Sequence, residues 1–242
     1  MSRPKVFVLY SPGTNCHEEA ADAFKLAGGD PAVCNITDDL LGGKKRLTDC
    51  DILALPGGFS FGDHLAAGRI ATLDLIYRLK DQLEEVKDKE IPIIGICNGF
   101  QILVNTGLLP ADAVADPTAI LDRNTSAVFE DRWTDCVVQK SNCLWTKGLE
   151  GKTLRIPVAH GEGRLRVTDN FDDAQTVVRY GSDEGTMDYP DNPNGSKVGR
   201  AGICDPSGRI FGLMPHPERA IYPWLGSDDG LAVFQAGVAA VA

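Results

Sequence analysis

Residues 91–103, which read Ile-Pro-Ile-Ile-Gly-Ile-Cys-Asn-Gly-Phe-Gln-Ile-Leu, decide the fold of this chain. The first six residues form an apolar run, a G-x-C-x-G pattern follows at 95–99, and apolar residues then recur at helical spacing until Gly107. This order predicts a strand, a sharp turn and a helix. A strand that is apolar on both faces is typical of a parallel sheet covered by helices, so the stretch predicts an α/β fold.

The same alternation of strands and helices precedes this stretch. Apolar runs at 5–10 and 51–55 each end in a Pro/Gly turn, and apolar residues recur at helical spacing over 17–26 and 70–86. We therefore expect a doubly wound, mostly parallel open sheet of the flavodoxin-like kind.

The second half predicts additional antiparallel strands. Short β-like pieces occupy 127–129, 133–138, 153–158, 165–167 and 176–180, and two more strands at 201–204 and 210–214 flank a turn. Residues 181–196 are rich in Gly, Asp, Asn and Pro and predict a polar loop, while 231–241 predict a closing helix. With no linker or repeat, we expect residues 1–242 to form a single domain.

Composition excludes several classes of partner. The chain has 242 residues, with 24 Lys+Arg against 34 Asp+Glu and a net charge of −10, so a nucleic-acid partner is not expected. No apolar stretch approaches the ~20 residues that span a bilayer, which predicts a cytoplasmic protein with no membrane partner.

The cysteines and histidines give no pattern typical of a metal site. The seven cysteines are scattered singly and predict reduced thiols, and no C-x-x-C occurs. His216 and Glu218 spell the H-x-E of zinc deaminases, but the required P-C-x-x-C is absent. We therefore expect no metal.

Cys97 is the candidate nucleophile. Its G-x-C-x-G setting matches the logic of the G-x-S-x-G elbow, in which a strained turn between strand and helix exposes the nucleophile and flanking glycines avoid clashes. The first turn of the next helix places unpaired N–H groups and a positive dipole end there, which favours the thiolate. The other six cysteines are interpreted as small, buried, inert thiols.

A cysteine nucleophile needs a base and a group that orients the base. Met214-Pro-His-Pro-Glu218 follows an apolar strand, and the two prolines favour extended geometry that places His216 and Glu218 on the same side. His216 is therefore the candidate base and Glu218 the group that fixes its tautomer. His160, in a glycine-bracketed turn with Gly161, could line the site or simply end a strand.

A Gly57-Gly58 pair follows the second strand and should reach the same edge of the sheet as Cys97. The N–H of Gly58, paired with that of Asn98, would form an oxyanion hole. Neither a P-loop nor a dinucleotide fingerprint is complete, since Thr146 stands where a P-loop requires glycine. The sequence thus predicts a hydrolytic site without its own ATP or redox cofactor.

On these residues the chain resembles the class I, triad-type glutamine amidotransferases, and among them it is similar to the glutaminase subunits of phosphoribosylformylglycinamidine synthase in purine biosynthesis. The resemblance covers nearly the whole chain in the family's order. It is carried by the motifs at 12–16, 56–63, 95–103, 157–164 and 214–220.

The resemblance implies a reaction. Cys97 would attack the side-chain amide of glutamine, His216 would shuttle the proton, and Glu218 would hold His216. Gln101 would contact the amino-acid end of the substrate, with Gly57, His160 and Gly161 around the same pocket.

The resemblance also implies partners. Ammonia would pass to a large synthase subunit that holds ATP and Mg and aminates formylglycinamide ribonucleotide, commonly with a small third subunit. Because the chain begins with methionine, we expect a separate subunit rather than a domain of a fused synthase.

Two alternatives compete with this hypothesis. A chaperone, deglycase or peptidase-like protein of the related superfamily would also carry a cysteine elbow, but those members lack the downstream H-P-E. A non-catalytic module that retains the fold would not need Cys97, His216 and Glu218 together.

Overall fold

The computed structural model describes residues 3–111, 113–182 and 184–242, and its centre is one sheet of nine strands in the order β2-β1-β3-β4-β11-β10-β9-β6-β7. The first five strands of this order are parallel, and each of the remaining neighbours pairs antiparallel. A second, two-stranded antiparallel sheet consists of β5 and β8. The expectation of a doubly wound parallel sheet with antiparallel strands added in the second half is confirmed.

The strands have the following bounds: β1 Lys5–Tyr10, β2 Asp30–Asn35, β3 Ile52–Leu55, β4 Ile93–Ile96, β5 Ala119–Asp122, β6 Glu130–Val138, β7 Thr153–His160, β8 Arg164–Val167, β9 Thr176–Tyr180, β10 Arg200–Cys204 and β11 Ile210–Leu213. Every residue of β3, β4 and β11 is buried. These three strands are apolar on both faces because helices or loops cover both sides of the sheet.

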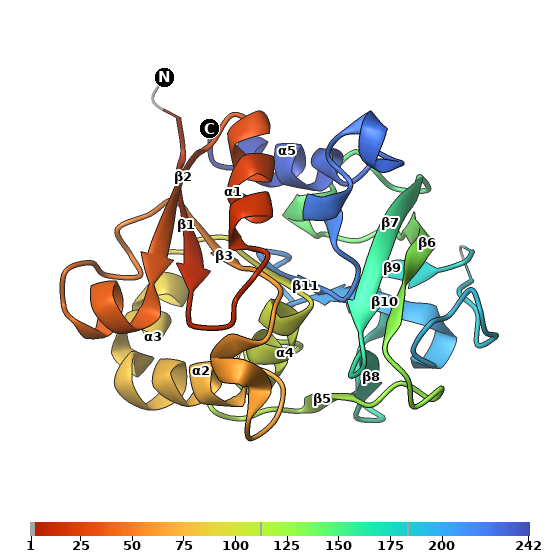
Figure 1. Ribbon diagram of the computed structural model, residues 1–242, viewed down its shortest axis with the longest axis horizontal. Coiled ribbons are helices and arrows are strands. Elements are labelled where there is room, and N and C mark those ends of the chain that lie inside the picture. Colours follow the sequence, from red (N-terminus) through yellow and green to blue (C-terminus); the bar gives the residue numbers. More distant parts are fainter. Residues whose placement is uncertain (1–2, 112, 183) are drawn as a thin grey trace.

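The helices have these bounds: α1 His17–Leu26, α2 Arg69–Leu73, α3 Lys80–Asp88, α4 Asn98–Asn105 and α5 Leu231–Ala239, with short helical turns that include η2 Ser60–Asp63 and η6 Lys197–Gly199. Helix α1 packs against α5, and α2 packs against α4. Figure 1 shows α1 and α5 on one side of the parallel strands and α2, α3 and α4 on the other.

Two local predictions were wrong. The helix expected over 70–86 is divided into α2, a π-helical segment Asp74–Arg78 and α3, with a break at Leu79. The strand expected at 127–129 is a bend, in which Ala127 has a φ of 57°, and β5 at Ala119–Asp122 pairs with β8 instead. Two exposed apolar side chains, Val128 and Phe129, produced the misleading β-like pattern.

The order of the parallel strands determines where a site can form. Strands β1, β3, β4 and β11 run in the same direction, so the segments that follow them emerge at one edge of the sheet. That edge carries the residues after Tyr10, Leu55, Ile96 and Leu213. Within the described ranges, no helix is long and apolar enough to cross a membrane.

Candidate active site

Cys97 lies on a strained turn between β4 and α4. Its φ of 52° and ψ of −106° fall outside the usual regions for a residue with a side chain. The neighbouring glycines are required: a Cβ at Gly99 would lie 1.8 Å from the carbonyl oxygen of Leu55, and one at Gly95 would lie 2.7 Å from that of Gly99. The sharp turn predicted from the G-x-C-x-G pattern is therefore present.

Helix α4 begins directly after the nucleophile candidate, with Cys97 as its N-cap residue. The first N–H groups of a helix have no intrahelical partner, so the Asn98 N–H is available beside the sulfur. Gly58 approaches from the end of β3 with a φ of 138°, and a Cβ there would lie 2.6 Å from the backbone nitrogen of Asn15. Only glycine fits this close passage between two loops.

His216 and Glu218 form a buried hydrogen-bonded pair after β11. The Nδ1 atom of His216 lies 2.6 Å from Oε1 of Glu218, and both side chains are almost fully buried. Burial alone would lower the pKa of His216, but the Glu218 carboxylate and the Cys97 sulfur outweigh burial and raise that pKa well above its usual value. The pair therefore favours a protonated imidazole.

Cys97 and His216 meet in one cavity. Both line a space of about 180 Å³ together with Gly58 and Ala159, and the Cys97 Sγ lies 3.6 Å from the Ala159 carbonyl oxygen. Glu218 takes Nδ1, so Nε2 of His216 is left for the sulfur; this buried nitrogen has no hydrogen-bond partner assigned among the described residues. The structure thus brings the predicted nucleophile, base and orienting carboxylate together.

A second cavity of about 230 Å³ also has Cys97 in its wall. Gln101, Gly161, Glu162 and Asp63 contribute to its wall. The Gln101 Nε2 donates to the Glu162 carbonyl oxygen at 2.7 Å, which fixes the amide at the cavity wall. The two cavities share Cys97, so a substrate that fills one presents its reacting atom to the base in the other.

The Asn98 side chain holds Gln101 in the cavity wall through hydrogen bonds. Its Oδ1 accepts from the Ser60 N–H at 3.2 Å and from the Ser60 hydroxyl, and its Nδ2 donates to Gln101 Oε1 at 3.0 Å. Asn98 Nδ2 also lies 3.3 Å from Asp63 Oδ1, although the largest effect on Asp63 is burial, which raises the pKa of its carboxyl. These bonds tie the loop after β3 to the start of α4.

Gly57 packs on the base, whereas His160 is enclosed away from it. A Cβ on Gly57 would lie 2.7 Å from Cε1 of His216. His160 is 2% exposed, and its Nδ1 lies 3.2 Å from Asn124 Oδ1, which also accepts from the Gly163 N–H at 3.0 Å. Burial, helped by the charge of His216, lowers the pKa of His160 to about 3. His160 is therefore neutral and shapes the turn that carries Gly161.

Three residues of the site were not singled out from the sequence. Cys16, interpreted as an inert thiol, has its Sγ 3.9 Å from Nδ1 of His216 and 3.1 Å from Nη2 of Arg219. Phe129 and Arg219 line the cavity of the base. The signal for Cys16 was its position after β1, at the same edge as the other loops.

Cys16 differs chemically from Cys97. Burial raises the pKa of the Cys16 thiol, and Cys16 approaches the imidazole nitrogen that Glu218 already occupies. Donor atoms of Cys16, His216 and Glu218 converge within 4.8 Å, the kind of cluster that can bind a metal. The Arg219 guanidinium beside Cys16 adds positive charge there and disfavours a cation.

A cysteine elbow next to a buried His–Glu pair, at the carboxyl edge of a doubly wound sheet, defines a class I glutamine amidotransferase. A family model described as the CobB/CobQ-like glutamine amidotransferase domain matches residues 3–231. The chain belongs to this family, in the branch of the PurQ subunits.

Individual relatives agree with this placement. The phosphoribosylformylglycinamidine synthase subunit PurQ of Dehalococcoides mccartyi is 41% identical, with 97% of this chain and 96% of the relative covered. The PurQ subunit of Treponema denticola is 40% identical, over 90% of this chain and 89% of its own. A chain of the PurLQS structure from Thermotoga maritima matches with a TM-score of 0.82 and 33% identity, and the match covers 100% of both chains.

Proposed function

We propose that this chain, as a single domain over residues 1–242, hydrolyses glutamine to glutamate and ammonia and delivers the ammonia to a synthase subunit. The acceptor is formylglycinamide ribonucleotide, which the synthase converts to formylglycinamidine ribonucleotide with ATP and Mg bound on its own chain. A small third subunit completes the assembly. The PurQ names of the relatives and the PurLQS assembly of Thermotoga maritima support this choice of acceptor and partners.

The first step is acyl transfer to the sulfur. The Cys97 thiolate attacks the side-chain amide carbon of glutamine, and imidazolium His216 gives its proton to the leaving nitrogen, so ammonia departs and a glutamyl thioester remains. Glu218 keeps the imidazole in the required tautomer throughout. The observation that carries the proposal is the meeting of Cys97 and His216 in one cavity.

The second step releases glutamate. His216, now neutral, takes a proton from water, the hydroxide attacks the thioester carbon, and the Cys97 sulfur leaves. In both steps the N–H groups of Gly58 and Asn98 stabilise the tetrahedral oxyanion, and each donor contributes roughly 10²–10³ in rate.

The substrate backbone lies in the cavity beside Gln101. Polar groups of Gln101, together with the turn at His160 and Gly161, face the amino-acid end of glutamine, while Gly57 leaves room next to the imidazole. Gly161 lines the cavity directly, and His160 acts through the shape of the turn.

The test is glutamate release by the chain together with its synthase partner. Cys97→Ala is expected to abolish release, whereas Cys34→Ala, a matched change at another buried thiol, leaves it intact. Loss of release in both variants, or in neither, contradicts Cys97 as nucleophile. A chaperone or peptidase-like protein with the same elbow would release no glutamate even in its unmodified form.

A further inference from the structure

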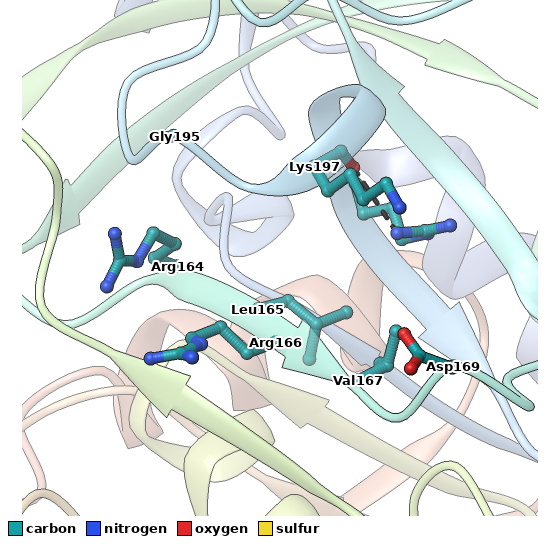
Figure 2. A pocket seen from close by; sticks show the side chains of 8 residues that line it. Arg164, Leu165, Arg166, Val167, Asp169, Gly195 and Lys197 are labelled. Atoms are coloured by element: carbon teal, nitrogen blue, oxygen red, sulfur yellow. Dashed lines mark hydrogen bonds between the residues drawn. The ribbon is translucent and has the colours of Figure 1, made fainter.

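A basic cavity lies outside the proposed site. It has a volume of about 460 Å³, and eight residues line it: Arg164, Leu165, Arg166, Val167, Asp169, Gly195, Lys197 and Arg200. Figure 2 shows Arg164 and Arg166 on β8 and Lys197 on the neighbouring turn η6. None of the eight also lines the two cavities that meet at Cys97.

Carboxylates compensate the positive charge of this cavity only in part. Arg164 and Arg166 share the single carboxylate of Asp122, with contacts of 2.6 and 3.2 Å. Likewise, Arg179 and Arg200 share the single carboxylate of Asp173.

Lys197 has no ion-pair partner among the described residues, and Asp169 is the one acid among the residues that line the cavity. Arg179 does not line the cavity but shares Asp173 with Arg200; when it is counted, five cations are matched by three carboxylates, so the wall and its ion-pair partners carry an excess of two positive charges in a chain whose net charge is −10.

One hydrogen-bond donor in the wall is unused. The Nε atom of Arg164 is buried and has no partner among the described residues. A buried donor without a partner costs about 1–3 kcal/mol, so such groups in a native structure call for an acceptor. Because this nitrogen has almost no exposed surface, an anion in the cavity would accept from it only after a shift of the Arg164 side chain.

The cavity is held in shape without a ligand. The Leu165 N–H donates to the Ser196 hydroxyl at 2.9 Å, which joins β8 to the segment that carries Gly195 and Lys197. Gly195 has a φ of 77°, and a Cβ there would lie 2.4 Å from a side-chain carbon of Thr125, so the segment packs closely on its other side as well. A preformed wall lowers the ordering cost of binding.

We propose that this cavity binds the phosphate group of a small phosphorylated metabolite. A phosphate monoester carries a charge of about −1.5 to −2 at pH 7, which matches the excess of two positive charges. Arginine forks match phosphate oxygens bidentately, and the partly exposed Val167 offers apolar surface to the rest of the molecule. The site is independent of glutamine hydrolysis.

The binding test uses isothermal titration calorimetry on the full chain. The probes are inorganic phosphate, ribose 5-phosphate and AMP, with ribose and adenosine as their counterparts without phosphate. Saturable binding of at least one phosphate-bearing probe, and none of ribose or adenosine, is expected. Whichever of the three probes binds most tightly distinguishes free phosphate, a sugar phosphate and a nucleotide as the source of the phosphate.

Two variants locate the binding. Lys197→Gln and Arg166→Gln change exposed side chains. Each should lower the affinity for the phosphate-bearing probe about tenfold, because each removes one cation from the cavity. Lys25→Gln, at an exposed lysine of α1, is the matched control and should leave the affinity unchanged. Unaltered melting temperatures verify that the variants fold.

Three results would overturn the proposal. The first is no saturable binding of any of the three phosphate probes at millimolar concentration. The second is equal affinity in the unmodified chain and in both cavity variants. The third is adenosine binding as tightly as AMP, which would show that the phosphate is not what the cavity recognises.

Discussion

The chemistry of the site depends on which nitrogen of one imidazole faces which sulfur. Glu218 takes Nδ1 of His216, and Cys97 shares a cavity with the other side of the ring. Cys16 also lines the cavity of His216, but it approaches Nδ1, and it does not line the cavity beside Gln101. The two thiols near the base therefore have different expected roles.

Glu218→Gln should lower turnover roughly 10²-fold while changing the KM for glutamine little. The neutral amide no longer stabilises the imidazolium and can hold the wrong tautomer, whereas the cavity at Gln101 is untouched. Steady-state kinetics of glutamate release with the partner present measure both constants. Unchanged turnover, or a rise in KM alone, would contradict the orienting role.

Cys16→Ser should reduce glutamate release by less than about tenfold, in contrast to the complete loss on Cys97→Ser. The hydroxyl retains a polar neighbour for Arg219 and the imidazole, and no bond to substrate is lost. Parallel assays of the two serine variants decide the question. An equal loss of glutamate release in both variants would contradict the assignment of Cys97, rather than Cys16, as the nucleophile.

His160 should make the protein sensitive to acid. Its pKa is about 3 in the folded chain and about 6.5 when unfolded, so the unfolded state binds the proton first and stability falls as pH drops below about 6.5. His216 has a raised pKa and contributes in the opposite direction: its stabilisation is complete below about 6.5 and is lost as pH rises through the folded-state value.

Comparison with His160→Gln isolates the contribution of His160, because His216 is common to both proteins. The cost of the substitution in unfolding free energy should be about 2 kcal/mol smaller at pH 5 than at pH 7.5. Urea unfolding of both proteins at the two pH values measures this difference in unfolding free energy. A cost independent of pH would mean that His160 is accessible to protons in the folded chain.

At the level of single elements, the turn from β4 to α4 is the most constrained part of the fold. Leu55 of β3 and Gly99 of α4 approach so closely that no side chain fits between them. This contact presses the helix that begins at Cys97 against the sheet, which fixes the direction of the sulfur.

Gly99→Ala should cost about 3 kcal/mol in unfolding free energy, because its Cβ would lie 1.8 Å from a backbone oxygen that cannot move away. Gly43→Ala is the control: its φ is 71° but nothing lies within 4 Å, so only the backbone penalty of about 1 kcal/mol applies. Thermal and denaturant unfolding measure both. Equal costs would show that the close contact relaxes freely.

The elements around the site could be predicted from the sequence where the apolar residues of the pattern are the ones that the fold buries. Strand β1, helix α1 and the elbow at Cys97 follow directly from apolar periodicity and glycine placement. The loop at residues 127–129 could not be predicted, because an exposed apolar pair in a loop has the same local pattern as a strand. The role of Cys16 depends on distances between loops, which periodicity does not encode.

At the scale of the whole molecule, exposed apolar side chains lie at the opening of the cavities that share Cys97. Phe59 and Phe129 are 48% and 53% exposed, and both line the two cavities that share Cys97. A partner that covers this mouth would shield the thioester from bulk water and receive the ammonia.

We therefore expect weak glutaminase activity from the isolated chain and a marked increase when the synthase subunit is added. The same glutamate assay, run with a titration of the partner, measures the increase. High activity of the chain alone, unaffected by the partner, would contradict gating through this surface.

The insertion of β11 between β4 and β10 has a consequence for biosynthesis of the enzyme itself. His216 follows a strand near the end of the chain, yet that strand lies in the middle of the sheet beside the one that ends at Cys97. A nascent polypeptide on the ribosome thus carries its thiol without its base until the residues that follow β11 have been translated. A product truncated before β11 would carry the thiol without His216 and Glu218, and we expect it to release no glutamate from glutamine.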